Sequence, residues 1–388
     1  ALCDGETAEC EAGTQKIHWL GWFEMEYTLR SLGSFSEMKY GKMPNKKMSS
    51  DKGKYPIFSG YRVVGYCDEC NIGEQQLVVV ARGVGGTGDV KLSPGACFLT
   101  NLSIAVLVDE SVALKKYLYY YFLKNNLRYL DSGSAQSQIT IGDLKNVEVP
   151  LPSIETQKKV VSILDVIDEK INNNVAINDN LADLLQTIYQ ERFGNDILAV
   201  NQGVLSDICS YSRDKVAVSE LNVITYFSTE NMLSGKAGST EATSLPTTSQ
   251  TTACHKGDTL ISNIRPYFKK IVYCEDKCGC STDVLCFTPS QPCYSAYLFS
   301  TLYADKFFAF MVAGSKGTKM PRGDKQQIMT YPVVLPSEEE LAGFNTIASP
   351  LLEQIYSNRA ENKRLSILRD TLLPKLMSGE INVSAVQL

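Results

Sequence analysis

The sequence contains an internal duplication, which restricts the possible folds more than any other feature. Leu151-Pro152-Ser153 and Leu335-Pro336-Ser337 stand 184 residues apart, and each begins a segment of about forty residues. Between residues 169 and 187, eight positions are identical to the residue 184 further on, without a gap. The identical pairs are Glu169/Glu353, Ile171/Ile355, Asn174/Asn358, Ala176/Ala360, Asn178/Asn362, Leu181/Leu365, Leu184/Leu368 and Thr187/Thr371. Such spacing indicates two copies of one structural unit.

Each repeated segment has the pattern of one long helix. Ser153 and Ser337 stand where an N-cap belongs, and acidic residues follow in the first turn. A heptad register places Val160, Leu164, Ile167, Ile171, Asn174, Asn178, Leu181, Leu185 and Ile188 at a and d in the first copy, and Phe344, Ala348, Leu351, Ile355, Asn358, Asn362, Leu365, Arg369 and Leu372 in the second. Each helix would be about 60 Å long. Pro350 predicts a kink or break near the start of the second helix.

Two asparagines lie at mid-helix core positions in each copy. A buried asparagine costs stability, and its best-known use is to determine helix register. If the helices pack antiparallel about a pseudo-two-fold axis, Asn174 would meet Asn362, and Asn178 would meet Asn358. We therefore assign all four side chains to helix-pair register. In the alternative interpretation, each helix buries a different face and these asparagines are solvated.

Mixed segments with short β-like runs, broken by Gly and Pro, precede each helix. The predicted parts are an N-terminal extension at 1–24, a first globular domain at 25–152, a first spacer helix at 153–194, a second globular domain at 195–336 and a second spacer helix at 337–383. The predicted fold class is α+β. Two globular mixed α/β domains are separated by two long helices, which form an antiparallel coiled coil with a pseudo-two-fold repeat.

Only a few residues match between the two globular segments. Residues 133–143 resemble residues 314–324 at a spacing of 181, so the repeat gains three residues before the helices begin. Earlier in the two segments, Arg82 is matched with Arg265, at a spacing of 183. The globular copies have diverged, whereas the helices have stayed alike. We therefore expect the two domains to bind different ligands while the helices support both in the same way.

The glycine run from Gly83 to Gly88 fits the spacing of a dinucleotide-binding fingerprint, G-x-G-x-x-G. That fingerprint needs a helix to begin at the glycines, because the helix N-terminus binds the pyrophosphate. Ser93-Pro94-Gly95 follows instead, which indicates turn and strand. The glycines therefore predict a turn in which the backbone approaches a neighbour closely, and dinucleotide binding is the disfavoured alternative.

Catalytic motifs are missing from the sequence. It contains neither the Asn/Asp-Pro-Pro-aromatic motif of amino-group DNA methyltransferases nor the G-x-x-x-x-G-K-[ST] motif of ATP-driven enzymes. Two histidines leave little scope for His-based catalysis. We expect a chain that is not an enzyme by itself.

Twelve cysteines in a long chain without a visible secretory signal predict reduced thiols and a cytoplasmic protein. Cys67-x-x-Cys70 and Cys274-x3-Cys278-x-Cys280 lack clean second ligand pairs, so no metal site is predicted. No apolar run is long enough to span a membrane.

Local basic clusters oppose the overall charge of −5. Residues 37–62 carry seven basic and two acidic side chains, interleaved with aromatic residues, a mixture suited to phosphates and bases. The second half has its own basic residues around 265–270 and 316–325. The competing interpretation is a solvated loop, but clusters in both copies of an acidic chain favour double-stranded DNA as the ligand.

These features resemble the specificity subunit of type I restriction–modification systems. The segment Pro150–Val161 resembles the opening of that family's central conserved region, and Leu368–Ile381 is close to its C-terminal signature. Arg82-Gly83, and Gly133-Ser134 before Gly142-Asp143, resemble parts of its target recognition domains. The likeness extends over about residues 25–383.

The resemblance implies a non-catalytic subunit whose two target recognition domains each recognise half of a split DNA target. The helices would determine the gap between the half-sites. They would also dock two methyltransferase subunits, which methylate adenine N6, and two restriction subunits would be further partners. Those partners would use S-adenosylmethionine, ATP and Mg, so this chain would need no cofactor.

From charge and loop position we select candidate DNA-contacting residues in both domains. They are Lys39, Lys42, Lys46, Arg62, Arg82, Asn101 and Gln136 in the first domain, and Arg265, Lys269, Asp283, Lys316, Lys319 and Arg322 in the second. Two alternatives stay open: a fused restriction–methylation enzyme, which the missing motifs disfavour, and a protein-interaction scaffold without sequence-specific DNA binding.

Overall fold

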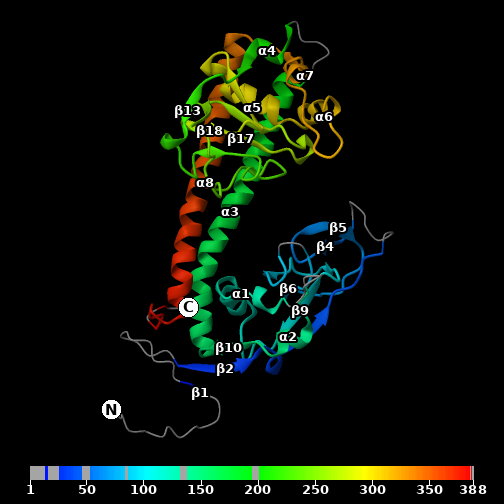
Figure 1. Cartoon of the computed structure of the whole chain (residues 1–388), viewed down its shortest axis with the longest axis vertical. Coiled ribbons are helices and arrows are strands. Elements are labelled where there is room, and N and C mark those ends of the chain that lie inside the picture. Colours follow the sequence, from blue (N-terminus) through cyan, green and yellow to red (C-terminus); the bar gives the residue numbers. More distant parts are fainter. Residues whose placement is uncertain are drawn as a thin grey trace. The chain divides into compact units, whose positions relative to one another are not determined.

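The computed structural model describes residues 14–15, 26–45, 53–83, 86–131, 138–194, 201–384 and 386 (Figure 1). The chain divides into two compact units. The first unit comprises Ala1–Ile171 and Lys363–Leu388, and the second comprises Asn172–Asn362. Two long helices, α3 (Ile154–Phe193) and α8 (Glu338–Met377), each contribute to both units.

The first unit is built on a four-stranded antiparallel sheet. Its strand order is β3 (Ser36–Tyr40), β9 (Ser103–Val108), β6 (Leu77–Val80) and β7 (Val90–Leu92). A smaller sheet has the order β5 (Val63–Cys67), β4 (Tyr55–Phe58) and β8 (Phe98–Leu99), and a third has β1 (Thr14–Gln15), β2 (Tyr27–Ser31) and β10 (Glu148–Leu151). The α-helices are α1 (Lys115–Lys124) and α2 (Ile141–Lys145), with short 3-10 turns at Leu32–Ser34 and Arg128–Leu130.

The main sheet of the second unit repeats the strand order of the first, whereas the smaller sheets differ. The main sheet has the order β12 (Cys209–Tyr211), β19 (Val284–Pro289), β16 (Thr259–Ser262) and β17 (Ile271–Tyr273). A second sheet has the order β13 (Lys215–Ala217), β15 (Gln250–Cys254), β18 (Cys278–Cys280) and β14 (Tyr226–Phe227), and β11 (Gln202–Val204) pairs with β20 (Pro332–Val334). The α-helices are α4 (Leu205–Ile208), α5 (Ser295–Tyr303), α6 (Asp305–Ala313) and α7 (Lys325–Met329), with 3-10 turns at Val218–Glu220, Pro266–Phe268 and Pro292–Tyr294.

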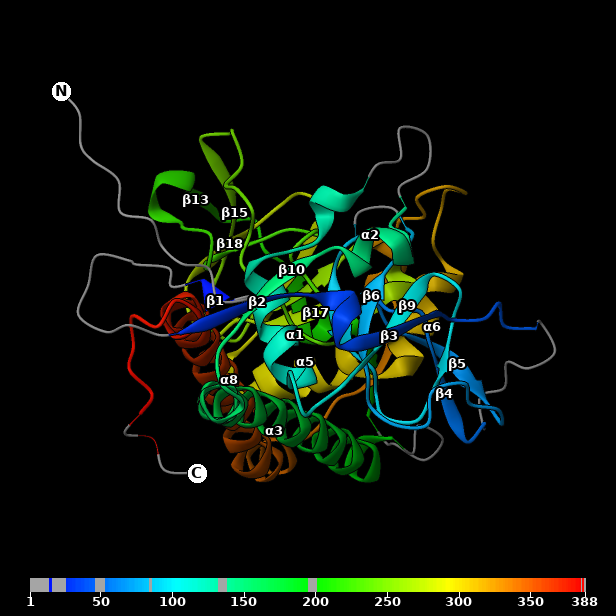
Figure 2. The same cartoon turned by 90° about the horizontal axis from the view of Figure 1, so that it is seen from below.

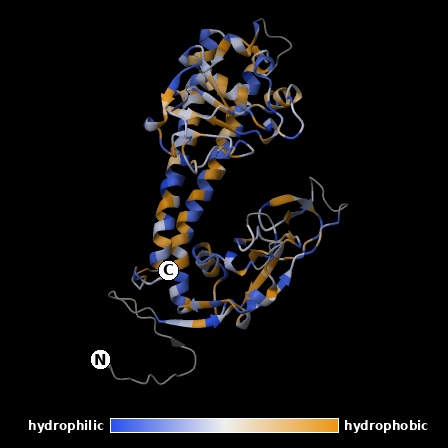
Figure 3. Ribbon diagram, viewed as in Figure 1, coloured by the Kyte–Doolittle hydropathy of each residue, from blue (hydrophilic) through white to orange (hydrophobic). Residues whose placement is uncertain are grey.

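Apolar strands at the centre of each main sheet form the cores. All four residues of β6 and of β16 are buried, as expected for continuous apolar or small side chains covered on both faces. Figure 3 shows apolar residues on the sheet strands of each unit and alternating hydropathy along the long helices. Leu118 of α1 shares the first core with Leu164 of α3 and Leu376 of α8, while Tyr297 of α5 shares the second with Leu185 and Phe344.

The long helices pack antiparallel within each unit and lie side by side in both views (Figures 1 and 2). The predicted N-caps are confirmed: Ser153 Oγ accepts a hydrogen bond from Thr156 N at 3.2 Å, and Ser337 forms a reciprocal capping box with Glu340. The heptad prediction also agrees with burial at most positions. Arg369, an unusual core-position residue, donates to Asp168 Oδ1 of α3 at 2.9 Å.

Of the kink or break predicted at Pro350, the break is wrong, because α8 continues through both Pro350 and Pro374, and the kink stays a prediction. Proline removes one backbone hydrogen bond and costs about 3 kcal/mol in a helix interior. The flanking Ala348 and Leu352 are buried in the second core. Their packing offsets that cost, so tertiary contacts override the local preference.

The spacing between the copies also needs correction. Thr140 caps α2 and Asp324 caps α7, and these caps are 184 residues apart. The similar Gly142-Asp143 and Gly323-Asp324 pairs, 181 apart, therefore occupy different places in the two helices. The hydroxyl and the carboxylate each accept hydrogen bonds from backbone N–H groups of the first turn, so different residue types perform one capping role.

Candidate nucleic-acid interface

A turn between β8 and β9, Thr100–Ser103, joins three loops of the first domain. Thr100 N donates to Phe58 O at 3.0 Å, which places the β4–β5 connection beside the turn. Asn101 N donates to Lys42 O at 3.1 Å, and Arg82 N donates to Leu102 O at 3.1 Å. Backbone hydrogen bonds therefore collect segments that are far apart in sequence.

The turn brings together four of the seven candidate residues of the first domain. Lys42, Arg62 and Arg82 are exposed and Asn101 is partly exposed, so their side chains are available to a ligand. Lys39 is also exposed, but it lies within β3 opposite Ala105, away from this turn. Lys46 and Gln136 lie outside the described residues.

Tyr61 packs against the glycine turn that follows β6. A Cβ added at Gly83 or Gly86 would lie 2.3 Å from the Tyr61 side chain, so glycine permits this close approach. Burial, together with the negative charge of Asp89, raises the pKa of Tyr61. Gly86–Gly88 form a turn and strand β7 follows, which confirms the predicted turn at the described glycines.

Hydrogen bonds also gather loops of the second domain. Arg265 N donates to Pro321 O at 2.8 Å, and Lys316 and Arg322 exchange two backbone hydrogen bonds of 2.9 Å. Arg265 has φ 51°, a left-handed conformation that non-glycine residues seldom adopt. Its Nη2 lies 3.5 Å from Lys319 O, and its buried Nε has no hydrogen-bond partner among the described residues.

Two carboxylates pair with cations of this loop. Arg322 Nη2 donates to Asp283 Oδ1 at 2.9 Å, and Lys316 Nζ donates to Asp324 Oδ2 at 2.5 Å. The hydrogen bond from Lys316 is the main reason that the pKa of Asp324 is lowered. Asp283, predicted from sequence as a DNA contact, thus orients the Arg322 guanidinium. Five of the six second-domain candidates adjoin one another here: Arg265, Asp283, Lys316, Lys319 and Arg322.

Lys269 belongs to a different group of charges. Its Nζ donates to Asp305 Oδ1 at 2.9 Å, and Lys236 Nζ donates to the same oxygen at 2.7 Å. These two hydrogen bonds lower the pKa of Asp305. Sequence reasoning missed Lys236 because 69 residues separate it from Asp305 and no local pattern connects them.

The two domains place arginine at the same junction of their main sheets. Beyond β6, Arg82 pairs with Gln138 in an isolated antiparallel bridge, and beyond β16, Ile264 pairs with Arg322. Ala81 O and Asn263 O accept from Ile139 N and Gly323 N, which confirms the equivalence. Arg82 therefore corresponds to Ile264, one position before the Arg265 that sequence alignment selected. In the first domain the arginine of this bridge, Arg82, follows β6, whereas in the second domain it is Arg322, on the opposite segment of the bridge.

Over the ranges that the structure describes, no group of three His, Cys, Asp or Glu side chains is arranged to hold a metal ion. In the same ranges, no helix is long and apolar enough to cross a membrane.

The chain is similar to known proteins in sequence and in fold. Residues 24–182 match the family described as type I restriction modification DNA specificity domain. A putative type I specificity subunit of Mycoplasma pneumoniae is 30% identical over 166 residues, which cover 40% of this chain and 44% of that relative. A type I restriction enzyme specificity subunit of Methanocaldococcus jannaschii is 23% identical over 332 residues, 73% of each chain.

A solved structure extends the likeness to nearly the whole chain. The crystal structure of a type I restriction–modification S subunit from M. genitalium matches with a TM-score of 0.60 and 21% identity, covering 91% of this chain and 96% of the other. This match shows a common fold. The family match shows that residues 24–182 belong to the type I restriction modification DNA specificity domain family, and over its longer matches the chain is similar to type I specificity subunits.

Proposed function

We propose that this chain is the DNA sequence-specificity subunit of a type I restriction–modification complex. It recognises a bipartite, asymmetric target, with one domain for each half-site. Each domain presents an arginine-bearing loop at the same junction of the same strand order, although the loop sequences differ. This observation supports the proposal most directly. Both domains hold their loops in the same position, but the loops carry different side chains, as expected if each domain recognises different bases.

The long helices act as a spacer between the half-sites. We propose that they form an antiparallel coiled coil with pseudo-two-fold symmetry and thereby determine the gap in the target, since half-site spacing is geometric. The asparagine pairs hold the two helices in register. Asn174 Nδ2 donates to Asn362 Oδ1 at 2.8 Å and Asn358 Nδ2 donates to Asn178 Oδ1 at 2.9 Å, which supports this role.

The same helices dock two methyltransferase subunits, and two restriction subunits complete the nuclease. Leu184 and Leu368, which are related by the repeat, expose 47% and 46% of their surfaces. Two matching apolar positions on repeated helices suit two copies of one partner. The partners supply catalysis, S-adenosylmethionine, ATP and Mg, and this chain contributes recognition alone.

Methylation mapping tests the proposal. The chain is expressed with its methyltransferase subunit in cells, and methyladenine is located by long-read sequencing of their DNA. We expect a split motif with a constant gap and methyladenine on both strands. The variants Arg82→Ala and Arg322→Ala should each relax specificity in one half of the motif and leave the other half unchanged.

A scaffold function makes the opposite prediction. The two proteins would then associate, but no sequence-dependent methylation would appear. Loss of association would instead contradict the docking role of the helices. A motif that changes in both halves with either arginine variant would contradict the assignment of one domain to each half-site.

A further inference from the structure

Five cysteines converge in a small buried core of the second unit. Cys254 ends β15, Cys278 and Cys280 lie in β18, Cys286 lies in β19, and Cys274 follows β17. Each is no more than 4% exposed, and all five belong to one hydrophobic cluster with Met232, Leu260, Val272 and Val284. Cys254 is twenty residues from the next cysteine in the chain, so spacing alone does not connect it with the other four.

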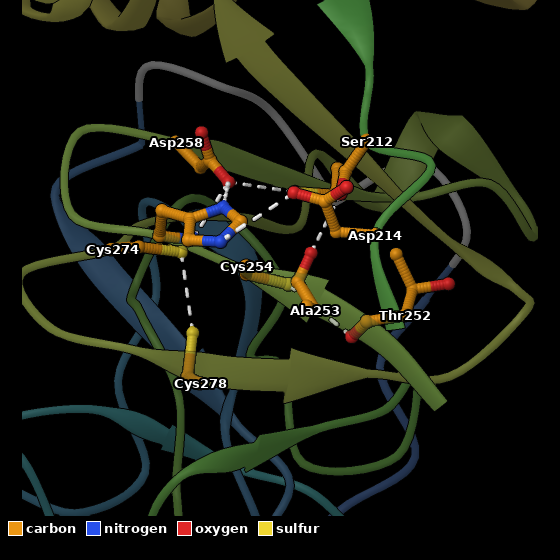
Figure 4. A network of polar contacts seen from close by, with 10 residues as sticks. Ser212, Asp214, Thr252, Ala253, Cys254, Asp258, Cys274 and Cys278 are labelled. Atoms are coloured by element: carbon orange, nitrogen blue, oxygen red, sulfur yellow. Dashed lines mark hydrogen bonds and ion pairs between the residues drawn. The ribbon is translucent and has the colours of Figure 1, made fainter. Parts of the chain in front are cut away.

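Two of these thiols are already close enough to react. Cys274 Sγ and Cys278 Sγ lie 3.5 Å apart, and Figure 4 shows them facing each other across the turn that joins their strands. A disulfide needs an S–S distance of about 2.05 Å, so a small rotation of the side chains is sufficient. Between them, Asp276 and Lys277 are exposed, so opening this short turn gives a small reagent access to the buried pair.

The surroundings favour a thiolate at Cys278. Hydrogen bonds with Cys254 and Cys274, with a smaller contribution from His255, lower the pKa of the Cys278 thiol below its usual range. In contrast, burial raises the pKa of Cys209 to about 12 and that of Cys97 to about 11. A thiolate is the reactive form of cysteine. The pKa values of the neighbouring Cys254, Cys274 and Cys286 are also raised, so Cys278 differs from the other thiols of its own cluster as well.

We propose that Cys274 and Cys278 form a redox modification site that closes to a disulfide in the presence of hydrogen peroxide. The Cys278 thiolate attacks one peroxide oxygen, the O–O bond breaks, and a sulfenic acid and hydroxide form. Cys274 sulfur then displaces the sulfenic hydroxyl, and its thiol proton leaves with that hydroxyl as water. Both sulfurs are oxidised, and the peroxide is reduced to two molecules of water once the hydroxide is protonated.

Peptide mapping of the full chain tests this site without DNA, so its outcome is independent of the proposed function. The reduced protein is treated with hydrogen peroxide, unfolded, alkylated with iodoacetamide and digested. We expect the peptide carrying Cys274 and Cys278 to lose two hydrogen atoms and to lack both alkyl groups, while Cys280 and Cys286 remain alkylated. Reductant should restore alkylation at both positions.

Two variants separate the pair from its neighbours. In Cys274→Ser, the sulfenic acid at Cys278 has lost its partner and should be captured by dimedone. Cys280→Ser removes a buried thiol of the same strand as a matched control and should keep the disulfide. Thermal melting of both variants checks that they fold, and if Cys274→Ser does not fold, peptide mapping of the unmodified chain still decides the proposal.

Three results would overturn the assignment. Cys274 and Cys278 could stay fully alkylated under conditions that oxidise the exposed Cys70 and Cys293. The disulfide could join Cys254 to Cys278, which face each other between β15 and β18. Zinc bound by the purified chain could also protect these thiols from peroxide until a chelator removes it.

Discussion

Asn358 Nδ2 donates a hydrogen bond of 2.9 Å to Asn178 Oδ1, and both side chains are buried between the long helices. Gln354 Nε2 completes the group by donating to Asn358 Oδ1 at 2.8 Å. A buried amide that loses its partner costs about 1–3 kcal/mol, whereas a matched apolar pair can be neutral or stabilising. The pair is therefore suited to define register.

Asn178→Leu alone should lower stability, because it leaves the Asn358 amide without its acceptor on α3. We expect a loss of about 1–3 kcal/mol, seen as a lower melting temperature. The double variant Asn178→Leu/Asn358→Leu should recover most of this loss. A double variant no more stable than the single one would contradict a pairwise role for these asparagines.

Arg369→Met should destabilise the first unit, because Arg369 donates to Asp168, which also accepts from Tyr120 Oη at 2.8 Å. Removing the cation leaves a partly buried carboxylate, with an expected cost of about 1–3 kcal/mol. Thermal melting at low salt measures this effect. Arg364→Met is a matched control, because Arg364 lies on the same helix and is exposed, so it should change stability by less than about 0.5 kcal/mol.

Gly41→Ala should disrupt the turn that gathers the first-domain loops. A Cβ at this position would lie 2.1 Å from Thr100 O and 2.6 Å from Leu99 O, and backbone oxygens cannot rotate away. We expect a cost of about 1–3 kcal/mol, as for overpacking, and weaker DNA binding. Gly73→Ala is the control, because its Cβ would meet nothing within 4 Å. Equal melting temperatures for the two variants would refute the close approach.

The pH dependence of stability should include a contribution from Glu275. Burial, followed by the negative charge of Asp276, raises the pKa of Glu275 from 4.5 to about 7. Between these values the folded chain binds more protons than the unfolded chain, so stability falls as the pH rises through this window. Glu275→Gln should therefore be relatively more stable above pH 7 and show no advantage below about pH 4.5. Glu169→Gln, at an exposed position within α3, is the matched control.

The salt dependence of DNA binding tests the charged loops. Each phosphate contact that is lost should reduce the slope of log K against log salt by about 0.9. Arg322→Ala should therefore weaken binding and flatten the slope if its guanidinium contacts a phosphate, or relax one base position if it contacts a base. Lys158→Ala, exposed on α3, provides the control. A change of neither slope nor sequence preference in Arg322→Ala would remove Arg322 from the interface.

Periodic features were predictable because they depend on neighbours in sequence. The heptad pattern and the serine caps specify both long helices, and the antiparallel expectation named the hydrogen-bonded asparagine pairs in advance. Apolar runs broken by glycine and proline also predicted short strands in both globular segments, where the structure has β6, β9, β16 and β19. Pro350 shows the limit of such reasoning, since burial of its neighbours outweighs its local preference.

The amino-acid sequence by itself determined the duplication, the helices, the family resemblance and the residue types available for DNA. Tertiary structure alone decided that Lys42, Arg62, Arg82 and Asn101 adjoin one turn, that Arg82 corresponds to Ile264, and that Cys254 joins four other thiols. These relationships depend on strand register and turn geometry between segments tens of residues apart. Local patterns constrain such non-local contacts only weakly, because many pairings of short strands bury the same apolar residues.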